Sequence, residues 1–322
     1  MFNVVRCSRR FLLFGIFFAA SGALGSIAEA ANLYASFDDE NTVHAFSPTG
    51  IDLGVFASAG LDQPTGIAFD SNGNLYVASF HNNTIQKFGP TGNHLGVFAN
   101  TGLSAPVGIA FDSSGNLYAA NFIGGSIHKF GPTGTDLGFF AFTGKTPVAL
   151  AFNTNGNLYV SDGIQNFSGG SIVSSTSVRV LSPTGNLLDT FNEQAGHSTP
   201  IGLAFDSNGD LLVADLDTST INKFSPDGAA LGTFASTGLN GPGGLAFDSS
   251  GNLFVANLGN NTIHKFGPTG TDLGTFAGAP FGTRPLFLAF APVPEPSSLT
   301  LVGAAVLIIG GFRVLRRRRA SE

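Results

Sequence analysis

The chain is poor in cysteine, methionine, tryptophan and charge. Among its 322 residues there is one cysteine, Cys7, one methionine, Met1, and no tryptophan. A single cysteine cannot form a disulfide within the chain, nor supply the several thiolates of a cysteine-based zinc site. The sequence also has no Gly-x-Ser-x-Gly elbow. We therefore expect a fold that is stable without disulfides, and we do not expect cysteine or serine hydrolase chemistry.

Charged residues make up only 11% of the chain, whereas typical globular domains have roughly 25%. The formal net charge is −6, and many of the basic side chains lie near the two ends, in residues 6–10 and 313–319. The segment between these ends is therefore more acidic than the whole chain. Acidic surfaces repel nucleic acid and anionic membranes, so neither is an expected partner.

One stretch of sequence organises the rest of the chain. It runs from Pro64 to Leu103 and holds four short apolar runs separated by turn-forming residues, among them Asp70-Ser-Asn-Gly-Asn74 and Gly89-Pro-Thr-Gly92. Similar stretches begin at Pro106, Pro147, Pro200 and Pro242, and a fragment begins at Pro285. A period of about 40 residues with four strands in each copy is typical of the blades of a β-propeller.

The two ends of the repeated region complement each other. Residues 32–57 match the second, third and fourth strands of the repeat but lack the first, whereas residues 285–290 match only the first. Five full copies and one composite copy therefore predict an all-β, six-bladed propeller over residues 31–292, closed by its N- and C-terminal strands. Closure also removes an exposed strand edge.

Three recurring positions have structural interpretations. The phenylalanine that ends each first strand is expected to pack between neighbouring blades. The turn Asp70-Ser-Asn-Gly-Asn74 superficially resembles a calcium loop, but Ser79 stands where such a loop requires a bidentate glutamate, which favours a simple turn. A third position holds His44, His128 and His264, and glutamine, arginine or asparagine in the other copies. This variety favours a solvated or hydrogen-bonded site within the blade over a ligand-binding role.

The segments that flank the repeats differ from them in composition. Residues 1–30 hold three arginines, the apolar run Phe11–Ala20 and the triplet Ala28-Glu-Ala30, the three parts of a cleavable signal peptide. Beyond residue 292, Val293-Pro-Glu-Pro296 precedes an apolar segment at 299–315 and an arginine block. We expect this apolar segment to form a membrane helix with the arginines on the cytoplasmic side.

The tail at residues 293–322 resembles a PEP-CTERM sorting signal, a bacterial tail that is processed by exosortase. The resemblance rests on the Val-Pro-Glu-Pro motif and the arginine block, namely Val293, Pro294, Glu295, Pro296, Arg316, Arg317, Arg318 and Arg319. It implies a Gram-negative bacterium, an exosortase-type partner, a precursor anchored in the inner membrane, and display on the cell surface or in an exopolysaccharide matrix.

The repeats follow the pattern Pro-x-Gly-Leu-Ala-Phe-Asp-x-x-Gly-Asn-Leu-Tyr-Val-Ala and resemble NHL-type propellers over nearly all of residues 32–290. The similar SMP-30/gluconolactonase propellers hold a divalent cation at the central opening with Glu, Asn and Asp. This chain departs from their pattern, because its first strands begin without a carboxylate, and Glu40 and Glu193 are the only glutamates in residues 31–292. A lyase similar to the streptogramin-inactivating propellers would need clustered histidines, whereas the histidines here are dispersed.

Polar residues end most of the predicted second strands, on the face where loops join successive blades. The candidate ligand-contacting residues on this face are Ser79, Asn121, Asp162, Glu193, His197, Asp215 and Asn257. Asp162 and Asp215 lie in adjacent blades and are the predicted metal ligands, with Ca²⁺ as the one cofactor considered. The alternative for the whole set is that these polar ends cap strands and hold channel water.

An insertion at residues 163–176 of blade 4 emerges from the same face. It either shapes a binding surface or is an insertion that the fold tolerates without a function.

Two classes of function stay open. The favoured one is an exported, non-enzymatic surface or matrix protein that binds a glycan, peptide or protein partner. The alternative is a metal-dependent hydrolase similar to the SMP-30-type lactonases.

Overall fold

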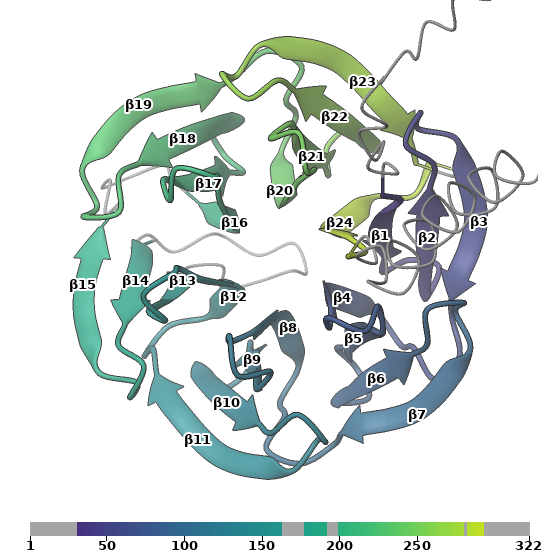
Figure 1. Ribbon diagram of the computed structural model, residues 1–322, viewed down its shortest axis with the longest axis vertical. Coiled ribbons are helices and arrows are strands. Elements are labelled where there is room, and N and C mark those ends of the chain that lie inside the picture. The colour runs from purple at the N-terminus through teal and green to yellow at the C-terminus, as the bar shows by residue number, and fades with distance from the viewer. Residues whose placement is uncertain (1–30, 163–176, 192–198, 280–281, 293–322) are drawn as a thin grey trace, which may run out of the picture.

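The computed structural model describes residues 31–162, 177–191, 199–279 and 282–292. In these ranges the chain forms 24 strands, arranged as six four-stranded sheets. The sheets stand around a central axis as the blades of a closed ring (Figure 1). The predicted six-bladed propeller with four-stranded blades is therefore confirmed.

Each blade runs from an inner strand at the axis to an outer strand at the rim. Blade 1 has the order β24-β1-β2-β3, and blades 2 to 6 follow as successive groups of four strands. The inner strands are β4 (Pro64–Phe69), β8 (Pro106–Phe111), β12 (Pro147–Phe152), β16 (Pro200–Phe205), β20 (Pro242–Phe247) and β24 (Pro285–Phe290). The second strands are β1 (Leu33–Phe37), β5 (Leu75–Ser79), β9 (Leu117–Asn121), β13 (Leu158–Asp162), β17 (Leu211–Asp215) and β21 (Leu253–Asn257).

The third strands are β2 (Thr42–Phe46), β6 (Thr84–Phe88), β10 (Ser126–Phe130), β14 (Ser177–Leu181), β18 (Thr220–Phe224) and β22 (Thr262–Phe266). The outer strands are β3 (Asp52–Ala57), β7 (His94–Ala99), β11 (Asp136–Phe142), β15 (Leu187–Phe191), β19 (Ala230–Ala235) and β23 (Asp272–Gly278). The second strands are buried along their whole length, whereas each outer strand has several residues exposed to solvent, mostly in its first half.

The ring closes as predicted, because β24 pairs with β1. The two strands lie side by side in blade 1 (Figure 1). Their pairing is antiparallel and places Leu33 opposite Phe290. An ion pair strengthens the junction, since Arg284 Nη2, just before β24, lies 2.8 Å from Asp38 Oδ2, just after β1. Strands from the two ends of the repeated region thus complete one blade.

The predicted packing of phenylalanines between blades is also confirmed. Phe111, at the end of β8, lies 4.9 Å from the ring of Tyr76 in blade 2, in an edge-to-face arrangement. Tyr76 also contacts Phe98 of its own outer strand, at 4.8 Å. The same trio forms the junction between blades 3 and 4, where Tyr118 contacts Phe152 and Phe140. These aromatic groups, together with the buried residues of the second strands, form most of the core between blades.

The Asp70-Ser-Asn-Gly-Asn74 segment is a turn, as predicted. Asp70 Oδ1 accepts hydrogen bonds from the backbone N–H groups of Asn72 and Asn74, each at 2.9 Å. Burial alone would raise the pKa of Asp70, but these hydrogen bonds, with that of the Asn74 side chain, outweigh it and lower the pKa. The carboxylate is therefore used to hold the turn.

The histidine register is a hydrogen-bonded site within the blade, as expected. Nε2 of His128 lies 2.6 Å from Oδ1 of Asp136, which belongs to the adjacent outer strand. His264 makes the same 2.6 Å contact with Asp272, and Nδ1 of His44 lies 3.1 Å from Asp52. These pairs fasten outer strands to the ring, far from its axis.

The flanking segments lie outside the described residues. The signal peptide at 1–30, the helix at 299–315 and the tail motif at 293–296 therefore stay predictions. In the ranges that the structure does describe, there is no helix with the length and apolar character of a membrane span.

Candidate functional site

The propeller has two faces of different construction. In blades 2 to 6, the turns that join inner to second strands lie on one face, which we call the turn face. The ends of the second strands, which pair with the starts of the inner strands, lie on the other. The pairs Ser79–Pro64 and Asn121–Pro106 are examples. We call this other face the loop face, because the connections between successive blades run over it.

The predicted polar residues do gather on the loop face, but at most 3% of their surface is exposed: Ser79, Asn121, Asp162, Asp215 and Asn257. Asn121 Oδ1 accepts a hydrogen bond from Ser104 N at 2.9 Å, and its Nδ2 donates to Gly102 O at 2.9 Å. Asn257 makes the equivalent contacts with residues 240 and 238. These side chains fasten the connections between blades.

Ser79 and Asp215 also fasten the connections between blades, Ser79 through its hydroxyl and Asp215 through its carboxylate. Ser79 Oγ accepts a hydrogen bond from Asp62 N at 2.8 Å. Asp215 Oδ1 accepts hydrogen bonds from the backbone N–H groups of Thr199, Asp217 and Thr218, at 3.2–3.3 Å. The strand-capping interpretation therefore accounts for the described contacts of both residues.

Asp162 differs, because its partner is a side chain. Its carboxylate is fully buried, and Oδ2 forms an ion pair at 2.6 Å with Nε of Arg179, on the neighbouring strand β14. Burial raises the pKa of Asp162 to about 6, although the positive charge of Arg179 opposes the rise. Asp162 and Asp215 occupy equivalent positions in blades 4 and 5. The backbone holds Oδ1 of Asp215, whereas both oxygens of Asp162 are buried with no hydrogen-bond partner of standard geometry among the described residues. Their role as metal ligands stays a prediction.

Two predicted site residues, Glu193 and His197, lie outside the described residues, as does the blade 4 insertion at 163–176. Among the residues that are described, no group of three or more His, Cys, Asp or Glu side chains is placed to bind a metal ion.

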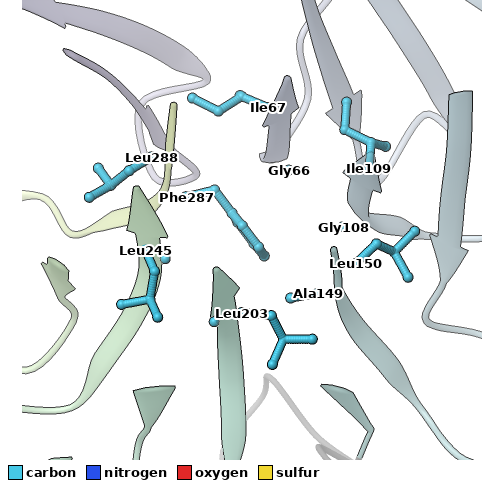
Figure 2. A pocket seen from close by; sticks show the side chains of 12 residues that line it. Gly66, Ile67, Gly108, Ile109, Ala149, Leu150, Leu203, Leu245, Phe287 and Leu288 are labelled. Carbon is cyan, nitrogen blue, oxygen red and sulfur yellow. The ribbon is translucent and has the colours of Figure 1, made fainter. Parts of the chain in front are cut away.

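The central channel is narrow, lined by small and apolar residues, and largely occupied by one side chain (Figure 2). Its open volume is about 90 Å³. The third residue of the inner strand is small in five blades, namely Gly66, Gly108, Ala149, Gly202 and Gly244. A Cβ on Gly66 would lie only 2.2 Å from Val107 O, so the inner strands approach too closely for larger residues. In blade 1 the equivalent residue is Phe287, whose ring points into the channel (Figure 2).

Phe287 connects opposite sides of the ring. It packs against the core cluster between blades 1 and 2 and against that between blades 4 and 5. It also contacts the buried apolar residues Val107, Val148 and Ile201 near the loop face. Its backbone N–H donates to Ser36 Oγ at 3.2 Å. Sequence reasoning did not assign this role, yet the signal was present as a phenylalanine in a register otherwise occupied by glycine or alanine.

Apolar side chains from blades 2, 3, 5 and 6 lie near the channel on the loop face. They directly follow second strands and are half-buried: Phe80, Phe122, Leu216 and Leu258. The rings of Phe80 and Phe122 lie 5.8 Å apart, and Phe80, Phe122 and Leu216 pack on Val107, Val148 and Ile201. We call these four residues the apolar ring. It was missed because each member, viewed in its own repeat, looks like an ordinary loop residue.

The NHL repeat family matches residues 61–88 and 239–266, which lie in blades 2 and 6. The chain carries NHL repeats. A comparison with curated proteins found no significant match.

Solved structures share the fold. A chain of a nidogen/laminin complex is 18% identical, with a TM-score of 0.68 over 82% of this chain and 99% of its own. A streptogramin B lyase is 15% identical, with a TM-score of 0.62 over 82% of this chain and 88% of its own. A gluconolactonase of Xanthomonas campestris is 20% identical, with a TM-score of 0.58 over 80% of this chain and 84% of its own. At these identities the similarity extends to the fold alone.

Proposed function

We propose that this chain is an exported binding module that takes a protein or peptide partner on its loop face. The observation that carries the proposal is the apolar ring near a channel largely occupied by Phe287. Partly exposed apolar side chains that gather near the centre of a face suit an interaction surface. Because the polar strand ends hold the surrounding loops, this surface is rigid before a partner arrives, which lowers the entropic cost of binding.

Export and display belong to the same proposal. The signal peptide at 1–30 would direct secretion, and the PEP-CTERM-like tail at 293–322 would anchor the precursor in the inner membrane until an exosortase-type enzyme processes it. The mature ring would then reach the cell surface or an exopolysaccharide matrix of a Gram-negative bacterium. A glycan of that matrix is a second class of partner for the loop face. The negative charge that aspartates give to the propeller favours partners other than nucleic acid.

The second candidate is a metal-dependent hydrolase. It is favoured by the gluconolactonase neighbour and by Asp162, a buried carboxylate with a raised pKa at the end of β13. In this case Ca²⁺ would bind near Asp162 and Asp215 on the loop face. Metal analysis of the purified protein, together with a lactonase assay with and without added Ca²⁺, separates this candidate from the binding module.

The binding proposal is tested by loop-face substitutions. Phe80→Ala combined with Leu216→Ala should weaken adhesion of the purified protein to the surface of producing cells at least tenfold. Val97→Ala is the matched control, because Val97 is 52% exposed on the outer strand of blade 2. Circular dichroism melts of both variants show whether the ring stays folded. Unchanged adhesion of a folded double variant would reject the loop face as the binding surface.

A further inference from the structure

A second recess lies on the turn face, at the junction where the ring closes. It has a volume of about 440 Å³ and lies between blade 6 and blade 1. Its floor is aromatic, since Phe254 makes edge-to-face contacts with Phe276 at 4.8 Å and with Phe290 at 5.1 Å. Its walls include the blade 6 turn, Pro48, and Ala31 and Ala291 at the two ends of the ring. We call it the closure pocket.

The pocket exists because blade 1 lacks a turn that the other five blades have. In those blades, the turn between inner and second strands places a glycine over a proline of the next turn. A Cβ on the glycine would lie 3.6–4.0 Å from that proline in each pair: Gly73 and Pro90, Gly115 and Pro132, Gly156 and Pro183, Gly209 and Pro226, Gly251 and Pro268. In blade 1 the inner and second strands are the two ends of the ring, so no such turn covers the equivalent proline, Pro48.

The position of the chain ends identifies the occupant. If the signal peptide is cleaved after Ala30, as its sequence predicts, no residues precede Ala31 in the mature protein. The chain that follows Pro292 then starts at the rim of the pocket, and each extended residue reaches about 3.4 Å further. The next four residues, Val293-Pro294-Glu295-Pro296, are three apolar residues and one acid.

The chemistry of the pocket suits this segment. Val293 and the prolines would cover Pro48 and the exposed edges of the phenylalanines. A residue before proline also favours an extended conformation, which fits a shallow recess. Lys265 Nζ lies 4.8 Å above the ring of Phe254 and 3.8 Å from Asp248 Oδ2. Since 3.8 Å is too long for a strong hydrogen bond, the ammonium of Lys265 can also pair with a second carboxylate, that of Glu295.

We infer that the closure pocket is the docking site of residues 293–296 of the chain's own tail. Docking holds the sorting motif against the folded ring, on the face opposite the apolar ring. In the anchored precursor the loop face is then directed away from the membrane and open to partners. The inference does not depend on what the loop face binds.

Disulfide trapping in the full chain tests this inference. In a Cys7→Ser background, Val293→Cys is combined with Ser250→Cys, since Ser250 lines the pocket. The protein is purified in detergent, and the rate of cross-linking under mild oxidation is measured, because a disulfide needs Cα atoms within about 7 Å. Docking predicts rapid cross-linking that Lys265→Gln slows at least threefold, because the charge partner of Glu295 is lost.

Lys129→Gln is the matched control. Lys129 occupies the same register in blade 3, with Nζ 3.7 Å from Asp112 Oδ2 and 4.9 Å from the ring of Tyr118. It should leave the cross-linking rate unchanged. A rate that Lys265→Gln does not alter would mean that the tail is merely tethered nearby, and would overturn the inference. Absence of the cross-link would overturn it as well.

Discussion

Truncation of one phenylalanine between blades should destabilise the ring by a predictable amount. The ring of Phe152 lies 4.9 Å from that of Tyr118 in the preceding blade, and packs on the cluster formed by Leu150, Leu158 and other buried residues. Phe→Ala substitutions in cores cost about 3–5 kcal/mol. Because Phe152 is half-buried, we expect Phe152→Ala to cost about 3 kcal/mol, at the lower end of this range.

The assay is denaturant unfolding of the purified protein, supported by thermal melts. In domains of 150–250 residues, 1 kcal/mol shifts Tm by about 2–4 °C, so Phe152→Ala should lower Tm by about 6–12 °C. The control is Phe139→Ala, since Phe139 has the same chemistry but is 63% exposed on an outer strand. It should cost under about 0.5 kcal/mol. Equal destabilisation by the two substitutions would refute the assignment of packing positions.

Three further predictions concern closure, charge and sorting. A chain ended after Thr283 loses β24 and should be insoluble or melt far below one ended after Pro292; equal melting temperatures would contradict closure by this strand. Burial raises the pKa of Asp162 from 3.8 to about 6, so the folded state binds more protons than the unfolded state between these pH values, and stability falls as pH rises through this window. Asp162→Asn should remove this pH-dependent contribution to stability, as measured by thermal melts at pH 4–7. An unchanged pH profile of Tm would argue against the raised pKa of Asp162. Alanines at positions 294–296 should leave the protein in the inner membrane of an exosortase-containing host, and normal surface display of this variant would exclude a sorting role for the motif.

The sequence was sufficient to predict the fold because the determinants of each blade are local. Four apolar runs and their turn residues recur in each of the five full copies, so the assignment of four strands to a copy is supported five times. The starts of the inner strands at Pro64, Pro106 and Pro147 coincide with the predicted starts of the repeats. The complementary ends fixed the number of blades, since only a closed ring unites them.

The candidate site was less predictable, because its features arise where repeats meet. Phe287 matters through its contacts with blades that are far away in the sequence. Arg179 occupies the histidine register, but it reaches Asp162 on a second strand, whereas His128 and His264 pair with outer-strand aspartates. The longer arginine side chain permits contact with Asp162 instead of an outer-strand carboxylate. The register of the repeat alone does not predict this contact. The positions of Asp162 and Asp215 were predicted, but their hydrogen-bond and ionic partners were not.

The departures from the repeat show where this chain differs from a ring of identical blades. A ring of identical copies would place glycine or alanine around the whole channel and a turn in every blade. Instead, blade 1 carries Phe287 on the axis and leaves Pro48 uncovered on the turn face, while blade 4 buries the ion pair of Asp162 and Arg179. The filled channel separates the two faces, so that a partner on the apolar ring and a tail in the closure pocket need not compete. This division of the molecule follows from the closure itself, because pairing β24 with β1 in one blade brings both ends of the ring, near Ala31 and Ala291, to the turn face and leaves the loop face unbroken at that junction.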